Sequence, residues 1–166
     1  MPLLKSLLYL AILGILAHFI GEALPRSAFK PELAPFSSFK WEQNGRIYER
    51  VAIHKWKDHL PDMSRVMKDM MPKRLSGGRV SAGNVYRLAV ETCVSETVHW
   101  ALCVSAFGVG IFWRGAARWI LPLIVILSNI PFIMIQRYNR PKLLALSKRL
   151  HKREEKYLHE GTDSVM

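Results

Sequence analysis

The stretch ETCVSETVHW, residues 91–100, opens a long apolar run that ends near Trp113. On a helix with 3.6 residues per turn, the polar side chains of this stretch fall within an arc of roughly 140°, which leaves the opposite face apolar. The polar arc contains Glu91, Thr92, Ser95, Glu96, His99 and Cys103. Carboxylates and an imidazole beside a membrane-length segment are costly unless they face protein, water or substrate. The stretch therefore predicts a small membrane enzyme built around this polar face.

The composition of the 166-residue chain favours a single membrane domain, since 50% of its residues are hydrophobic. Its 24 Lys and Arg against 13 Asp and Glu give a net charge of +11. Such an excess fits nucleic acid, an anionic membrane surface or a phosphorylated ligand. Because the charges flank apolar segments, with no groove of interleaved aromatic residues, we expect membrane headgroups and a phosphate-bearing substrate as partners, and no nucleic acid.

Neither the cysteines nor the histidines form a metal-binding pattern. Cys93 and Cys103 are ten residues apart on one predicted helix, about 15 Å of rise, which is too far for a disulfide. Glu96 and His99 match the Glu-x-x-His pattern of di-iron bundles, but such sites need a second copy on another helix. The sequence offers no second copy, so we expect no metal and no resident cofactor.

The first half of the chain reads as a membrane anchor followed by a polar segment. Residues 3–20 are apolar for long enough to cross a bilayer, and we expect residues 1–22 to be an uncleaved anchor, with a signal peptide as the alternative. Residues 23–83 are rich in proline, basic and aromatic residues, as in a segment lying at the membrane interface. Within it, residues 47–56 form a short strand or an amphipathic turn, and residues 60–71 a short amphipathic helix.

The second half reads as a transmembrane hairpin, residues 84–136, followed by a basic tail, residues 137–166. Its two spans, 85–113 and 119–135, are joined by a tight turn at 114–118. Nearly all Lys and Arg lie in the interfacial segment and the tail, so the positive-inside rule places both in the cytosol. We expect an all-α, multi-pass protein of the cell membrane with about three transmembrane helices, a cytosolic interfacial segment and a basic amphipathic C-terminal helix.

The turn also sets the register of the hairpin. If the two ends of the turn face each other, positions whose numbers sum to about 232 share a depth. His99 then lies beside Ile133 and Glu96 beside Gln136, close to the cytosolic interface. The acid, the base and the basic groups of the following segment converge at that level.

His99 with a carboxylate one turn away is a general-base arrangement. Either Glu96 or Glu91 could hold the imidazole in one tautomer while the ring removes a proton from an attacking hydroxyl. Arg137 and Arg140 could bind phosphates or an oxyanion, because a guanidinium presents a fixed fork of donors. The alternative is structural: Glu96 pairs with Arg137, and His99 only caps the interface.

Five motifs, spread in order over roughly residues 40–150, carry a resemblance to a known family. They are Lys55-Trp56-Lys57, Glu91-Thr92 with Glu96, His99-Trp100, Asn129-x-Pro131, and QRYNRPKL at 136–143. The pattern resembles the glycosyl-4,4'-diaponeurosporenoate acyltransferase family, which completes staphyloxanthin-type carotenoids. The resemblance implies transfer of a fatty acyl chain onto a glucose hydroxyl of a membrane-embedded glycosylated carotenoid.

Together these observations predict a membrane acyltransferase with its active site at the cytosolic interface. An activated thioester would donate the acyl group, and a hydroxyl of a lipid-like acceptor would receive it. The expected substrate-binding residues are Gln136, Arg137, Asn139, Arg140, Lys55, Trp56 and Lys57. A different lipid-modifying transferase and a non-catalytic membrane partner of a lipid-biosynthesis complex are the alternatives. A homo-oligomer or a biosynthetic complex is also open.

Overall fold

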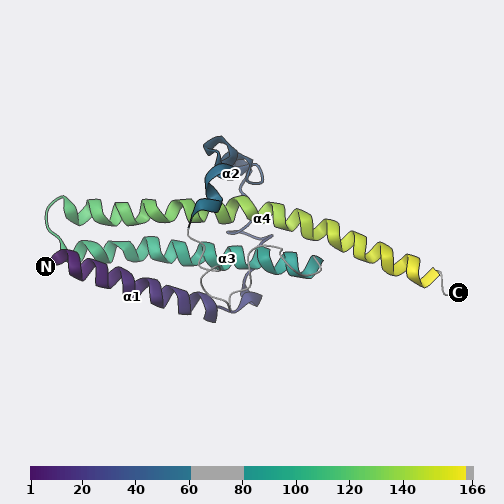
Figure 1. Ribbon diagram of the computed structural model, residues 1–166, viewed down its shortest axis with the longest axis horizontal. Coiled ribbons are helices and arrows are strands. Elements are labelled where there is room, and N and C mark those ends of the chain that lie inside the picture. Colours follow the sequence, from purple (N-terminus) through teal and green to yellow (C-terminus); the bar gives the residue numbers. More distant parts are fainter. Residues whose placement is uncertain (61–80, 164–166) are drawn as a thin grey trace.

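The computed structural model describes residues 1–60 and 81–163, with side chains placed up to Lys156. Three long helices lie side by side along one axis: α1 (Pro2–Ala23), α3 (Ala82–Ser105) and α4 (Ala117–Asp163) (Figure 1). The 3₁₀ helix η6 (Ala106–Phe112) continues α3 toward the hairpin turn. No strand occurs in the described part of the chain, which confirms the predicted all-α class.

All three helices are long and apolar enough to cross a membrane, over Pro2–Ala23, Ala82–Phe112 and Ala117–Lys156. Their large apolar side chains point outward; Val104 is 72% exposed and Ile111 77%. Such a surface is unfavourable in water but matches the acyl chains of lipids. These features confirm the predicted membrane protein with three transmembrane helices.

Small residues let α1 and the hairpin approach closely. The Tyr9 hydroxyl donates to the carbonyl of Ser105 at 2.7 Å, and a Cβ on Gly108 would lie only 2.3 Å from the same hydroxyl oxygen. At the other end of α1, a Cβ on Gly21 would lie 3.1 Å from a methyl group of Val98. Close approach at small residues is the usual way in which helices associate in lipid.

The hairpin has the expected register where α3 and α4 carry polar residues. Arg137 contacts Glu96, and Arg140 contacts Thr92, so the paired numbers sum to 233 and 232. The turn lies just before α4, and Gly115 adopts φ +59 there. The register predicted from the hairpin is therefore confirmed at these two pairs.

Helix α4 differs from the expected pair of separate segments. It runs without a break through the predicted boundary at residue 136, although Pro122, Pro131 and Pro141 lie inside it. Each proline removes one backbone hydrogen bond, a cost that contacts along α3 can offset. The chain approaches this part of α4 closely at Gly45, where a Cβ would lie 3.1 Å from the carbonyl oxygen of Tyr138. The chain here packs directly on the backbone of α4.

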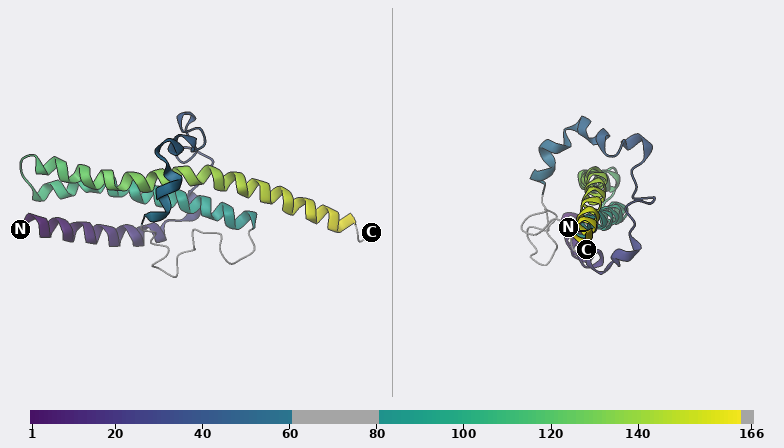
Figure 2. Two further views of the ribbon diagram at one scale, coloured as in Figure 1. Left: turned by 45° about the horizontal axis from the view of Figure 1, so that its top comes forward. Right: turned by 90° about the vertical axis from the view of Figure 1, so that its right-hand side faces the viewer.

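Residues 24–60, which we call the collar, wrap around the helices. Figure 2 shows them encircling α3 and α4 when the molecule is viewed along its long axis. The collar contains five short helical turns, which are in chain order η1 (Arg26–Ala28), η2 (Lys40–Glu42), η3 (Arg46–Val51), α2 (Ile53–Trp56) and η4 (Lys57–His59). Residues 47–56 are thus helical turns and no strand. The helix predicted at 60–71 falls almost entirely outside the described residues.

The collar has its own small core, formed against α4. Tyr48 and Ile53 pack on Tyr138, with Ile47, Trp56, Met134 and Ile135 around them. Two ammonium groups lie over the Tyr138 ring, Lys142 Nζ at 3.5 Å and Lys57 Nζ at 5.3 Å from its centroid. Such cation–π contacts add to the apolar packing. The collar is therefore held by side-chain contacts to α4.

Candidate active site

A buried cluster of four charged side chains joins the collar to α3 and α4. Arg137 lies between two carboxylates: its Nε is 2.5 Å from Oε1 of Glu42, and its Nη1 is 2.8 Å from Oε1 of Glu96. One turn further, Nη2 of Arg140 is 2.5 Å from Oε2 of Glu96. Glu42 and Arg140 are each 1% exposed, and Glu96 4%. The two positive and two negative charges cancel, which makes their burial tolerable.

Every N–H of Arg137 has an acceptor within the chain. Besides the bonds from Nε and Nη1, its Nη2 donates to Oε2 of Glu42 at 2.7 Å. The remaining two donors bind the carbonyls of Pro35 and Ser37 in the collar, both at 3.2 Å. A guanidinium has five N–H donors. In this arrangement Arg137 therefore has none left to offer a phosphate or an oxyanion.

Arg140 is held in a similar way. Its Nε donates to Oγ1 of Thr92 at 2.8 Å, its Nη2 to the Thr92 carbonyl at 3.0 Å, and its Nη1 to the Phe36 carbonyl at 2.6 Å. The Phe36 ring also lies under the guanidinium, 5.4 Å from Cζ to the centroid. The predicted role of both arginines in substrate binding stays a prediction, and this geometry favours positioning of the collar instead.

Glu42 is the collar's contribution to the cluster. It accepts one hydrogen bond from the Tyr48 hydroxyl and one, at 2.7 Å, from the backbone N–H of Phe39. Burial opposes its ionisation, but the donors from Arg137, Tyr48 and Phe39 outweigh burial and lower its pKa from the ordinary 4.5. Burial and the same carboxylate raise the pKa of Tyr48 above 10.0. At neutral pH, Glu42 is thus charged and Tyr48 neutral, as a fixed anchor requires.

His99 lies on the membrane side of this cluster, in the seam between α3 and α4. Its Nδ1 is 2.9 Å from Oδ1 of Asn129, and its ring stacks on Phe132 at 4.8 Å between centroids. The amide of Asn129 is oriented by a bond from its Nδ2 to the Val125 carbonyl, also 2.9 Å. Its oxygen must therefore accept, so Nδ1 of His99 carries the proton. In the neutral ring the lone pair is then on Nε2, the atom suited to act as a base.

The carboxylates predicted to orient His99 are placed elsewhere. Both oxygens of Glu96 bind the two arginines, and both oxygens of Glu91 bind Arg26, at 2.9 and 3.1 Å. Arg26 also donates from Nη1 to three carbonyls at the end of α1, those of Gly21, Glu22 and Leu24. The role of Glu96 or Glu91 in orienting the ring stays a prediction; the partner that the geometry gives to Nδ1 of His99 is Asn129.

A sequence model of the glycosyl-4,4'-diaponeurosporenoate acyltransferase family matches residues 26–149. The chain belongs to this family of acyltransferases. Its relatives include the glycosyl-4,4'-diaponeurosporenoate acyltransferases of Staphylococcus aureus strains N315, USA300 and COL. Each is 27% identical over 141 residues, which cover 83% of this chain and 83% of the relative. No solved structure matches the chain.

The part that matches the acyltransferase family contains both the charged cluster and His99. It begins at Arg26, which fastens the start of the collar to α3, and ends at Arg149, beyond Lys142, which contacts Glu49 of the collar. The shared region is therefore the collar together with the hairpin that it encircles. The anchor α1 lies outside the match.

The other residues predicted to bind substrate have mixed environments. Lys57 lies 3.4 Å from Oδ1 of Asn139, and the indole N–H of Trp56 donates to the Val51 carbonyl. Gln136 is 6% exposed, whereas Lys55 is exposed on the collar. The structure brings Lys57 and Asn139 together, and Asn139 lies ten residues, about 15 Å along α4, from the Asn129 that contacts His99. Their part in binding stays a prediction.

Glu42 and Asn129 were not among the predicted site residues. A charge count could have indicated Glu42: burying Arg137 and Arg140 with Glu96 alone leaves an excess positive charge, which one of the four collar acids must balance. Asn129 lies four residues before Ile133, the residue placed beside His99, so one turn of α4 brings its amide within reach. Both signals depend on first fixing the hairpin register.

Proposed function

We propose that this chain transfers a fatty acyl group from a thioester donor to a sugar hydroxyl of a lipid-like acceptor, such as a glycosylated carotenoid acid. Family membership supports the reaction class, and the names of the staphylococcal relatives support the acceptor. The hydroxyl oxygen attacks the thioester carbonyl carbon, an ester bond forms, and the carbon–sulfur bond breaks. The thiol leaves with the proton that the hydroxyl loses.

The observation that carries the proposal is the His99–Asn129 pair. With Nδ1 held as a donor, Nε2 can accept the hydroxyl proton and return it to the departing sulfur. Three residues separate His99 from Glu96, about 4.5 Å along α3, so the ring lies just inside the apolar region. A lipid-borne hydroxyl and an activated acyl chain can both reach this depth. No resident metal or cofactor is needed for this step.

The charged cluster supports this site by fixing the collar above it. Glu42, Arg137, Glu96 and Arg140 link collar, α3 and α4 within one or two turns of His99. Rigid neighbours of this kind keep a base in register with its substrate. We place collar and tail in the cytosol of the producing cell, with the site at the inner face of the cell membrane, because both segments are rich in Lys and Arg.

The test measures ester formation by mass spectrometry, with full-length protein in nanodiscs, a glycosylated carotenoid acid and acyl-coenzyme A. Replacing His99 by Ala should lower kcat by 10²- to 10⁴-fold, the range expected for a lost general base. Asn129→Leu should lower kcat less, and should shift the pH profile, because the ring loses the partner that fixes its tautomer. His18→Ala, which changes a histidine on α1, is the matched control and should retain activity.

Two results would redirect the proposal. Full turnover by His99→Ala would leave the ring a structural role and remove the assigned base. The second result combines three observations in cells: deletion of the chain abolishes the product, His99→Ala has no effect on it, and a stoichiometric membrane partner is recovered with the chain. That result would favour a non-catalytic role for the chain, as a partner in a biosynthetic complex.

A further inference from the structure

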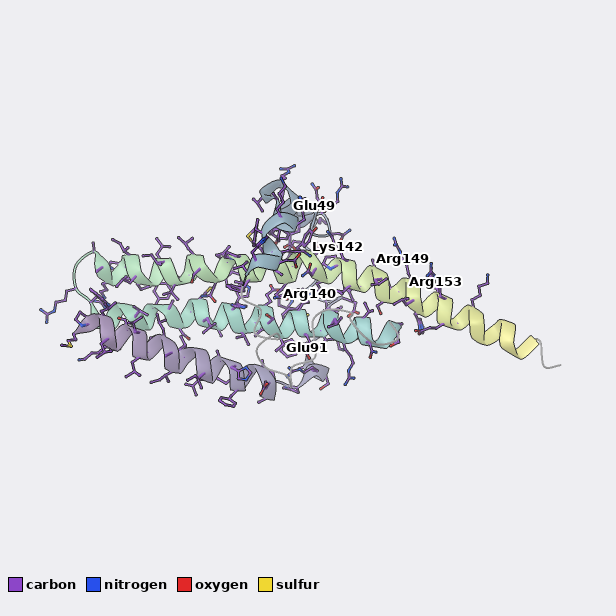
Figure 3. All side chains as sticks on the ribbon, in the orientation of Figure 1. Glu49, Glu91, Arg140, Lys142, Arg149 and Arg153 are labelled. Carbon is purple, nitrogen blue, oxygen red and sulfur yellow. The ribbon has the colours of Figure 1, made fainter. Side chains whose placement is uncertain are left out.

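The outer surface of α4 beyond the collar is strongly basic. Lys142, Arg149 and Arg153 lie within about 40° of one another around the helix, and we call them the basic face. All three are exposed, and Figure 3 shows them on the side of α4 that points away from α3. Lys148 and Lys152, also exposed, flank this face.

Lys142 pairs with Glu49 of the collar at 3.3 Å, whereas no acid within the described residues pairs with Arg149 or Arg153. Glu154 turns toward α3, where it accepts the backbone N–H of Ala82 at 3.0 Å, and Glu155 lies 3.3 Å from His151. The Ser147 hydroxyl also donates to the carbonyl of Ala82. Ser147 and Glu154 are therefore on the bundle side of α4, about 120–140° around from Lys142. The opposite side carries the positive charges of Arg149 and Arg153, with which no acid of the described residues pairs.

The height of the basic face favours a soluble partner over lipid headgroups. Arg137 lies at about the level at which α1 ends. Its partner Glu96 is two residues from Val98 on α3, and Val98 contacts Gly21 near the end of α1. Arg149 and Arg153 follow Arg137 by 12 and 16 residues, about 18 and 24 Å along the axis. The Debye length in physiological salt is about 8 Å, so headgroups at the level of Arg137 are largely screened from these charges.

The shape of the face favours a protein over a small phosphorylated molecule. From Lys142 to Arg153 the cations extend along about 16 Å of a convex helix. Binding a nucleotide calls for donors that converge on a few phosphate oxygens, whereas an acidic helix or patch of another protein matches a linear array of cations.

Resting on the acyl transfer proposed above, we propose that the basic face docks an acidic carrier protein that bears the acyl chain as a thioester on a flexible arm. Lys142 is the end of this face nearest the seam, and it lies 13 residues, about 20 Å, from the level of Asn129. A carrier docked there must therefore deliver its thioester along a long arm that passes the collar. The face supplies the recognition, and the seam at His99 supplies the chemistry.

The test compares two donors with the same acyl chain, one on an acidic bacterial acyl carrier protein and one on coenzyme A. Full-length protein is used in nanodiscs of zwitterionic lipid. Replacing Arg149 and Arg153 together by Glu should lower kcat/KM for the carrier-borne donor at least tenfold at low salt and less at high salt. The coenzyme A donor should change less than twofold, and the charge-keeping pair Arg149→Lys with Arg153→Lys should behave like the wild type.

Direct binding of the carrier to the nanodiscs, measured by interferometry, separates the two proposals. Binding that is lost in the Glu pair supports docking even if neither donor yields ester, in which case only the proposed reaction fails. A wild type that does not bind the carrier overturns the docking proposal. So do equal losses with both donors, or a loss that occurs only in nanodiscs of anionic lipid, which would assign the face to headgroups.

Discussion

Replacing Glu42 by Gln tests whether the buried cluster holds the collar in place. Glu42 accepts four hydrogen bonds, two of them from Arg137, one from Tyr48 and one from the backbone of Phe39. The side-chain amide of Gln has one oxygen and one NH₂ group in place of the two carboxylate oxygens. In either orientation, its NH₂ group therefore faces hydrogen-bond donors that a carboxylate oxygen of Glu42 accepts. The positive charge of Arg137 also loses its bidentate partner. Breaking a buried ion pair of this kind costs about 3–5 kcal/mol.

Hydrogen exchange read by mass spectrometry measures this loss in nanodiscs, because it reports local opening of the collar. At about 1.4 kcal/mol per factor of ten, we expect collar amides to exchange at least about a hundredfold faster in Glu42→Gln. The control is Glu49→Gln, which removes an ion pair with Lys142 in which each of the two side chains is 48% exposed. An exposed pair contributes about 0–1 kcal/mol, so exchange should change less than about fivefold. Equal effects of the two substitutions would refute an anchoring role for the cluster.

Two further outcomes follow from the geometry. Because the pKa of Glu42 is lowered on folding, its stabilisation is present above the ordinary value of 4.5 and is lost as the pH falls through the folded value. Pepsin cleavage of the wild-type collar, divided by cleavage of an unfolded reference peptide at the same pH, should therefore increase on acidification; the same ratio should change little in Glu42→Gln, and equal pH responses of the two proteins would contradict this. Gly110→Ala should lower the melting temperature in detergent, since its Cβ would lie 2.5 Å from the Arg118 carbonyl oxygen and force the hairpin apart at a cost of about 1–3 kcal/mol. Gly14→Ala, where the Cβ meets nothing within 4 Å, is the control, and a Gly110→Ala protein as stable as this control would count against the close approach.

The features that the sequence predicted well depend on local pattern and on one turn. Apolar runs of bilayer length identified all three spanning helices, since length and hydropathy decide insertion without reference to other segments. The tight turn then fixed the register, so the depth of Glu96 and its proximity to Arg137 followed from counting. Both quantities are set by neighbours along the chain, which a sequence displays directly.

The features that were missed depend on where a long irregular segment travels. The collar has no periodicity, and its route around α3 and α4 is set by contacts with α4 that involve Glu42, Tyr48 and Ile53. Without that route, Glu96 seemed available to His99, although Arg137 and Arg140 bind both its oxygens. The continuity of α4 was missed for another reason: the apolar run ends near Ile135 and a polar, basic segment follows it, but the backbone continues through both as one helix.

The position of the cluster also explains why the carboxylate of Glu96 and the imidazole of His99 have different partners. At the level where α1 ends, an unpaired Glu96 would carry a charge into a region of low dielectric, which is strongly unfavourable. Pairing it with two guanidiniums removes that cost and fixes the collar, but it also makes the carboxylate a poor orienter for a neighbouring ring. A neutral amide has no such cost, and Asn129 can therefore hold His99 deeper in the apolar seam. The same low dielectric that confines the charges to the boundary thus favours a neutral Asn–His pair on the membrane side of it, which is the pair that we propose as the acid–base element.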